Sequence, residues 1–267
     1  MARRSKSTTK RGATSKAKPK AASKAKAKPA TPLQVLRPRA RPRPLRWLLK
    51  WIWRLSLAAV VFGALALLAF RFLNPPTTPY MLSERARLGE IDQVWVPMER
   101  IAPVMARSAV AAEDANFCLH WGIDVDAVRA ALEDGGARGG STISQQVVKN
   151  VYLWHGRSYW RKGLEALITP AMEAVWTKRR ILEVYLNVAE FSEGVFGIEA
   201  AAQHYFGVAP ADLTATQAAR LAAILPAPKS RSASNPSSFV RNRARAIRAG
   251  AATIQADGRA ACFETAS

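Results

Sequence analysis

The most informative segment of this 267-residue chain reads Gly139-Gly-Ser-Thr-Ile-Ser-Gln-Gln-Val-Val-Lys-Asn150. Two glycines before a hydroxyl-rich helix start leave backbone N–H groups pointing at solvent, which forms an anion site. Helical spacing puts Gln145 beside Lys149 and Gln146 beside Asn150. The GxxxxGK[ST] spacing of a nucleotide-binding loop is absent. A capped glycine turn is the simpler alternative, but the density of amides, hydroxyls and Lys149 favours a functional site.

An acidic pair stands upstream of this segment, at the end of an apolar stretch. Val104–Ala112 has the pattern of a helix, which places Glu113 and Asp114 at its C-terminus. The helix dipole disfavours carboxylates there, and a disfavoured carboxylate has a raised pKa that suits a general base. An ordinary solvated acid pair is the alternative, and local chemistry leaves both interpretations open.

Charged residues of both signs follow downstream. Glu165 comes four residues after Arg161, which is the spacing of a helical salt bridge. Glu165 is also a candidate second catalytic carboxylate. The positive charges of Arg161, Lys162 and Lys178 suit phosphate binding.

Together these segments resemble glycosyltransferase family 51, the peptidoglycan glycosyltransferase module of penicillin-binding proteins. The similarity covers residues 80–245 and rests on four ordered motifs. The first, ED-x-x-F with H-x-G, is matched by Glu113, Asp114, Phe117, His120 and Gly122. The second is matched throughout Gly139–Asn150, and the third, RK-x-x-E, by Arg161, Lys162 and Glu165. The fourth, K-x-x-ILE-x-YLN, is matched by Lys178, Ile181, Leu182, Glu183, Tyr185, Leu186 and Asn187.

The resemblance implies a mostly α, lysozyme-like domain that polymerises lipid II onto a growing glycan strand carried by undecaprenyl diphosphate. It implies catalytic roles for Glu113, as general base, and for Glu165. The residues implied to bind substrate and diphosphate are Gly140, Ser141, Thr142, Gln145, Gln146, Lys149, Asn150, Arg161, Lys162 and Lys178. Those implied to be structural are Asp114, Phe117, His120, Gly122, Tyr185 and Asn187.

The resemblance leaves a divalent cation open, Mg²⁺ or Mn²⁺, with Glu165 as the candidate ligand, and we expect no organic cofactor. The motifs of a transpeptidase are not found, so we expect the monofunctional branch of the family. The family's small membrane-facing "jaw" suggests that Tyr80–Met105 touches the bilayer interface. Expected partners are the inner membrane and a cell-wall synthesis complex.

Positive charge is concentrated near the N-terminus. Of 40 Lys and Arg, 18 lie in residues 1–54, which hold none of the 19 Asp and Glu. Residues 1–46 have too few apolar side chains to offset the entropy of ordering, so we expect a disordered basic arm. Such an arm suits anionic lipid headgroups better than DNA, and we expect no nucleic-acid partner.

An uncharged run, Leu55–Phe70, follows the arm. Crossing a bilayer takes about 20 helical residues, and flanking tryptophans and basic residues extend the run to an expected anchor over 47–73. A buried core helix is a poor alternative because the run is apolar on every face. A cleaved signal peptide is poor because the preceding arm is too long. The positive-inside rule puts the arm in the cytoplasm and residues 74–267 in the periplasm.

The body reads as mostly helical, with few alternating strand patterns. Asp124 caps an expected helix that ends at Gly135-Gly136. We expect one helix over 141–153, another over 161–187, and a basic final helix over 239–256. A capping box, Thr214-Ala-Thr-Gln217, precedes a helix over 218–225 that Pro226 stops.

Composition and compartment exclude several classes of protein. Cys118 and Cys262 are too few for a disulfide scaffold or a four-cysteine zinc site, and no HExxH occurs among the three histidines. A kinase or nucleotide-dependent ligase would lack ATP outside the cell. A lysozyme-like or lytic glycan-cleaving enzyme is the alternative activity. A non-catalytic scaffold is the alternative outside enzymes.

Overall fold

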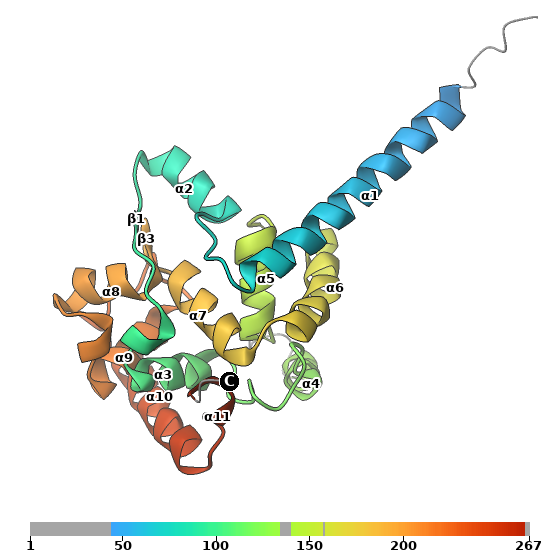
Figure 1. Cartoon of the computed structure of the whole chain (residues 1–267). Helices are drawn as coiled ribbons and strands as arrows, with labels where there is room; N and C mark the ends of the chain where they lie inside the picture. The colour runs from blue at the N-terminus through green and yellow to red at the C-terminus, as the bar shows by residue number, and fades with distance from the viewer. Residues whose placement is uncertain (1–43, 134–139, 157, 265–267) are drawn as a thin grey trace, which may run out of the picture. The chain divides into compact units, whose positions relative to one another are not determined.

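The computed structural model describes residues 44–133, 140–156 and 158–264 (Figure 1). The expected disorder of residues 1–46, apart from 44–46, and the expected helix end at Gly135-Gly136 therefore fall outside the described residues. Residues from Lys50 onward form one compact unit. Its helices are α2 (Pro79–Leu88), α3 (Pro103–Glu113), α4 (Val125–Glu133), α5 (Ile143–Tyr152), α6 (Tyr159–Val175), α7 (Lys178–Val188), α8 (Gly197–Phe206), α9 (Ala215–Ile224), α10 (Ser238–Ala256) and α11 (Ala261–Glu264), with short 3-10 turns η1 (Met98–Arg100) and η2 (Pro210–Asp212).

Helix α1 (Pro44–Phe70) contains the expected membrane anchor. It is 27 residues long, with a mean hydropathy of 2.1 over its most apolar window. Within the described ranges it is the one helix long and apolar enough to cross a membrane. Within the described residues it runs from Pro44, so residues 44–46, expected to belong to the disordered arm, are helical. These properties suggest a single-pass anchor.

Most helices of the body begin where the sequence places a cap. Thr142 and Gln145 form a reciprocal capping box at the start of α5, and Thr214 and Gln217 form another at the start of α9. Asp124 accepts a hydrogen bond from the Ala127 amide at 2.8 Å, as expected for the cap of α4. The three predicted caps are confirmed, although α5 and α9 begin at Ile143 and Ala215 rather than at the predicted residues 141 and 218.

The single helix predicted over 161–187 is wrong, because the chain breaks between α6 and α7. Trp176 is extended, with φ −100° and ψ 145°. Thr177 then caps a new helix by accepting a hydrogen bond from the Arg180 amide at 3.2 Å. The Trp176 indole donates to the Leu67 carbonyl at 2.7 Å, so the break also joins α7 to the end of α1.

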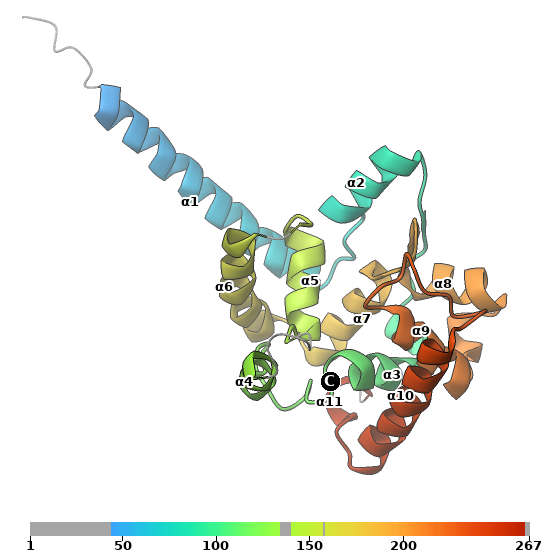
Figure 2. The ribbon, with the colours of Figure 1, turned by 180° about the vertical axis from the view of Figure 1, so that it is seen from behind.

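The core lies where α5 packs against α6 and α7, and where α3 packs against α9 and α10 (Figures 1 and 2). The largest fully buried side chains are Tyr185, Phe117, Phe191, Phe196 and Phe263. The prediction of a mostly α domain is confirmed. The apolar faces of the helices pack tightly against one another and form this core.

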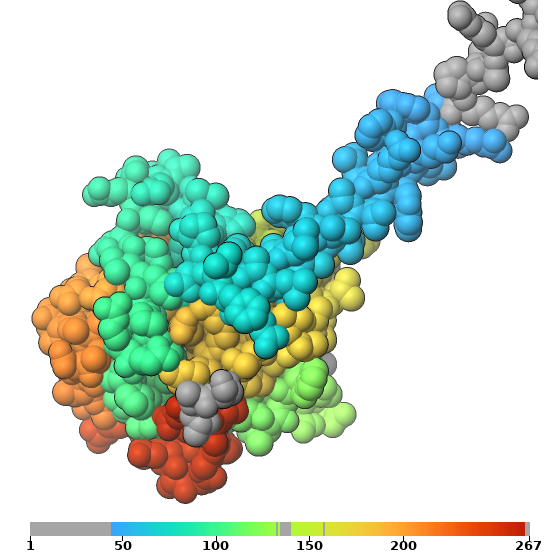
Figure 3. All heavy atoms as spheres, viewed as in Figure 1, coloured from blue at the N-terminus to red at the C-terminus, as the bar shows by residue number. Residues whose placement is uncertain are grey.

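A small sheet, which the sequence analysis does not predict, lies beside the helices. Its order is β1 (Asp92–Gln93), β3 (Val195–Phe196), β2 (Glu190–Ser192), with β1 parallel and β2 antiparallel to β3. The segment that holds β1, green in Figure 3, lies beside the orange surface of α8. Gly197 follows at φ +81°, and a Cβ there would lie 2.8 Å from the Asn187 carbonyl oxygen. Only glycine fits this crossing.

Candidate active site

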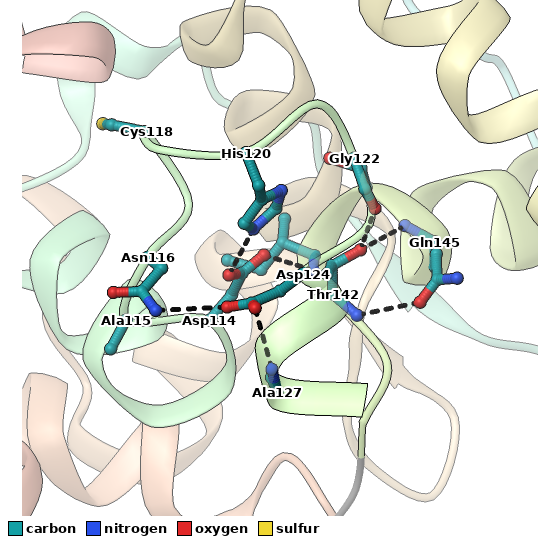
Figure 4. Close-up of polar contacts among 12 residues, drawn as sticks. Asp114, Ala115, Asn116, Cys118, His120, Gly122, Asp124, Ala127, Thr142 and Gln145 are labelled. Carbon is teal, nitrogen blue, oxygen red and sulfur yellow. Dashed lines mark hydrogen bonds and ion pairs between the residues drawn. The ribbon is translucent and has the colours of Figure 1, made fainter. Parts of the chain in front are cut away.

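The acidic pair lies at the end of α3, as predicted. Glu113 is the last residue of the helix and Asp114 is its C-cap. Asp114 is buried and accepts two hydrogen bonds (Figure 4). One comes from the Ile143 amide at 3.0 Å, and the other joins its Oδ1 to His120 Nε2 at 2.8 Å. Asp114 therefore ties the first motif to the start of α5, while Glu113 is left to face the cleft.

The loop after Asp114 is fixed by close packing on α5 and α6. The Thr142 hydroxyl donates to the Gly122 carbonyl at 2.5 Å (Figure 4). Gly122 has φ +79°, and a Cβ on it would lie 2.5 Å from Cγ2 of Thr169. Phe117 is fully buried in the core. The first and second motifs thus form one rigid wall.

A cleft of about 470 Å³ opens between the end of α3 and the start of α5. It is lined by residues 111–116, Asp124, Ala127 and residues 140–142. Glu113 and Asp114 are on one side, and Gly140, Ser141 and Thr142 are on the other. The structure therefore brings the predicted base and the predicted anion-binding segment to the same cleft.

Glu113 is largely buried, and this burial raises its pKa above the ordinary range. Gln146 Nε2 donates to its Oε2 at 2.9 Å, which opposes the rise. Arg243 Nη2 lies 3.9 Å from the other oxygen, Oε1, and lowers the pKa further. Oε1 is buried and accepts no hydrogen bond within the described residues.

Three cations, Lys149, Arg161 and Lys162, lie near one another, and Lys149 also acts on Glu113. Burial and repulsion by Arg161 lower the pKa of Lys149, while its attraction to Glu113 raises it. Burial, Arg161 and Lys149 likewise lower the pKa of Lys162. Lys162 Nζ also donates to the Ser141 hydroxyl at 2.9 Å. Cations that repel one another on a partly buried surface are suited to an anion that neutralises them.

Glu165 is buried against these cations. One of its oxygens pairs with Arg161, and the other lies 3.0 Å from Lys162 Nζ. The helical salt bridge considered from the sequence is therefore present. Because both oxygens already face positive charge, Glu165 in this arrangement does not fit a divalent cation.

A second group of potential ligands also has other partners. Ligand atoms of Asp114, His120 and Asp124 lie within 4.8 Å of one another. However, Asp124 accepts hydrogen bonds from the Ala127 amide and from Asn116, and Asp114 from His120 and Ile143 (Figure 4). This group acts as a structural clip, and a requirement for Mg²⁺ or Mn²⁺ stays a prediction.

Lys178 lies apart from the other predicted phosphate ligands. Its Nζ donates to the His120 carbonyl at 2.8 Å and to Glu173 Oε1 at 2.7 Å. The ammonium also lies 4.4 Å from the centre of the Phe117 ring. Lys178 thus holds the first-motif loop against α6 and α7. Its phosphate-binding role stays a prediction.

The remaining predicted residues lie in the protein interior. Asn187 bridges to the chain at Val96, accepting from its amide at 2.7 Å and donating to its carbonyl at 2.8 Å. Tyr185 is in the core, and burial raises its pKa well above the ordinary range. Asn150 and Gln145 are buried on α5. Gln145 serves the capping box, while the Oδ1 of Asn150 has no partner in the described chain.

Two residues of the site were missed by sequence reasoning. Arg243 reaches Glu113 from α10, far along the chain, and its only sequence signal is a basic helix. Glu173 accepts from both Lys178 and the Ser144 hydroxyl. Glu173 lies two helical turns after Glu165, on the same face of α6, and this spacing could have predicted it as a site residue.

Cys118 and Cys262 form a disulfide. Two cysteines are too few for a multi-disulfide scaffold, and no feature of the sequence predicts that they pair. The bond joins the first-motif loop to α11, across 144 positions of the chain. The C-terminal helix thereby becomes part of the support of the active-site loop.

Comparison with known proteins gives a consistent result. A family model described as transglycosylase matches residues 82–252. A biosynthetic peptidoglycan transglycosylase of Jannaschia sp. (strain CCS1) is 63% identical over 218 residues, covering 82% of this chain and 90% of the relative. A protein of the same description from Caulobacter vibrioides is 46% identical, covering 78% of this chain and 93% of the relative. Another, from Pectobacterium carotovorum subsp. carotovorum, is 48% identical, covering 77% and 89%.

Proposed function

The chain belongs to the transglycosylase family and is a peptidoglycan glycosyltransferase, and we propose that it polymerises lipid II by a single inverting displacement. The observation that carries this proposal is that a buried carboxylate and a group of cations share one site: Lys149 acts on Glu113 and lies near Arg161 and Lys162. Joining a sugar hydroxyl to a sugar diphosphate needs a base on one side and positive charge on the other.

Glu113 is the proposed general base. It takes the proton of the 4-hydroxyl of the acceptor GlcNAc as that oxygen bonds to C1 of the donor sugar. The bond from C1 to the diphosphate oxygen breaks at the same time, so an α-linked diphosphate becomes a β-1,4 bond. Undecaprenyl diphosphate carries away the electron pair. The raised pKa of Glu113 makes it a stronger base than a solvated carboxylate.

The cations Lys149, Arg161 and Lys162 are the proposed stabilisers of the departing diphosphate. Their mutual repulsion is relieved when an anion with several charges lies among them. Glu165 holds Arg161 and Lys162 in place through its ion pairs. Gln146 keeps Glu113 oriented through the hydrogen bond to Oε2.

Glycan cleavage lacks comparable support. The relatives described above carry names for biosynthesis, and a lytic enzyme would have no use for three cations beside its acid. A cleaving enzyme attacks a glycan that bears no diphosphate, so the positive charge of Lys149, Arg161 and Lys162 that Glu165 does not neutralise would meet no substrate anion.

The body is proposed to work at the outer face of the inner membrane. The charge asymmetry of residues 1–54 supports a cytoplasmic arm. Of the stretch 80–105 expected at the bilayer, Met81, Met98 and Met105 are buried in the core, whereas Leu82, Leu88 and Val94 are exposed. Helix α6 presents a further apolar surface. The exposed large apolar side chains of α6 are Tyr159, Trp160, Leu164 and Leu167. This aromatic face is suited to the membrane interface, where prenyl-linked substrates lie.

The proposal is tested with the full-length protein in detergent and fluorescent lipid II, with glycan length resolved on a gel. We expect a ladder of long strands that lysozyme digests and that Glu113→Gln fails to make. Preformed glycan is incubated in parallel. Shortening of that glycan, with no polymer from lipid II, would overturn the proposal in favour of the lytic activity.

A further inference from the structure

A second concentration of positive charge lies on the surface, away from the active-site cleft. A hollow of about 310 Å³ opens between α9 and α10, which lie side by side in Figure 2. Four arginines line it: Arg220 on α9, and Arg241, Arg245 and Arg248 on α10. We call this hollow the arginine pocket.

The arrangement of these arginines does not stabilise the folded chain by itself, because their positive charges lie close together. Arg241, Arg245 and Arg248 are spaced by four and three residues, so their guanidinium groups share one face of α10 and repel one another. Neither α9 nor α10 contains a single Asp or Glu. The floor is made of the small side chains Ala219 and Ala244, which leave the space between the guanidinium groups unfilled.

The arginines of the pocket have only neutral partners. Arg241 donates to the Pro236 carbonyl at 2.7 Å, and Arg248 donates weakly to the Thr216 hydroxyl at 3.4 Å. Across residues 44–133, 140–156 and 158–264, none of the four forms an ion pair with a carboxylate. By contrast, Arg180 pairs with a glutamate of its own helix. The pocket thus keeps a positive charge that the described chain does not neutralise.

We propose that the arginine pocket binds a phosphate-bearing anion. Guanidinium groups bind phosphate oxygens in pairs, and a pocket with four of them favours a group with more than one negative charge. Thr216 and Asn242 line the same hollow and supply a hydroxyl and an amide as further donors. The source of the phosphate is either a lipid headgroup or a soluble phosphate, since both present the same oxygens.

The pocket is distinct from the catalytic cations. Arg243, on the same helix, points to the other side and reaches Glu113. The four pocket arginines are absent from the lining of the active-site cleft. A phosphate ligand held here would not displace the diphosphate of the substrate. Binding at the pocket is therefore measurable with the active-site cations disabled.

The test is calorimetric titration of inorganic pyrophosphate into the full-length Lys149→Gln protein in nonionic detergent, at constant ionic strength. In that background we compare Arg245→Gln/Arg248→Gln with Arg85→Gln/Arg100→Gln, a control that removes two exposed arginines elsewhere. A charge-assisted pair is worth about tenfold in affinity, so we expect at least about tenfold weaker binding in the pocket variant and no comparable loss in the control. Arg220→Gln, on the other helix, should also weaken binding.

Competition distinguishes the two sources. If phosphatidylglycerol nanodiscs reduce pyrophosphate binding only when the pocket is intact, the ligand is a lipid headgroup. If the nanodiscs do not compete, the ligand is a soluble phosphate. Equal affinity in the pocket variant and the control would overturn the proposal, as would loss of all binding on Lys149→Gln. Preference for polyglutamate over pyrophosphate would replace the phosphate ligand with an acidic protein partner and would also overturn it.

Discussion

Replacing Arg243 by glutamine should move the acidic limb of the pH–rate profile to higher pH. The Arg243 Nη2 atom lies 3.9 Å from Glu113 Oε1 and stabilises the ionised carboxylate. Removing this positive charge favours the protonated form, so the pKa of Glu113 rises. A general base must be deprotonated to act, so activity in the variant is lost at a higher pH than in the wild type.

The size of this shift follows from the distance. Two unit charges about 4 Å apart interact by about 1 kcal/mol in water and about 4 kcal/mol at the effective dielectric constant of a protein surface. One pKa unit corresponds to about 1.4 kcal/mol, so these limits span roughly one to three units. One third of the Arg243 side chain is exposed, which increases solvent screening. We therefore expect a shift of about one unit.

The assay is the pH dependence of kcat/KM for lipid II polymerisation in detergent. Arg85→Gln is the control, because it removes an exposed positive charge that lies outside both sites and has no contact to Glu113. Arg243→Lys keeps the charge and should restore most of the profile. An acidic limb that stays in place while the plateau rate falls would refute the electrostatic role and leave Arg243 as a packing residue.

Three further predictions address the base, the cations and the disulfide. Glu113→Gln should lower turnover by about 10²–10⁴-fold. Its melting temperature at neutral pH should not fall. Burial raises the pKa of Glu113, so the ionised carboxylate does not stabilise the fold at neutral pH, and the carboxyl contributes to stability only as pH drops through that pKa. Lys149→Ala should abolish polymerisation with an unchanged melting temperature, whereas Lys178→Ala should lower the melting temperature, as calorimetry would show. Cys118→Ser/Cys262→Ser should cost about 2–4 kcal/mol of unfolding free energy by denaturant titration, and an unchanged midpoint would contradict this.

Local signals account for what the sequence could predict. The start of α5 is defined within four residues by Thr142 and Gln145, and α3 ends where its apolar pattern ends, at Glu113. Caps and periodicity act over one or two turns, so they are visible in a single sequence. The break at Trp176 was missed because the helical pattern continues across it, and a contact to Leu67 decides the outcome.

Contacts between distant segments account for what the sequence could not predict. Arg243 meets Glu113, and Cys118 meets Cys262, only after α10 and α11 have packed beside the first-motif loop. The same applies to Lys178, whose charge suggests phosphate binding until its partners are known. A charged residue in a motif can bind the ligand or hold the loop that does, and only geometry separates the two.

The disulfide and the charge distribution support the same membrane topology by independent physics. Positive charge resists transfer across the inner membrane, so the basic residues before α1 favour a cytoplasmic N-terminus. A disulfide persists in an oxidising compartment and is rare in the cytosol, so the bond between Cys118 and Cys262 favours a periplasmic body. One single-pass helix between the two segments satisfies both requirements. The reverse orientation would translocate the basic arm and expose the disulfide that supports the first-motif loop to cytosolic reductants.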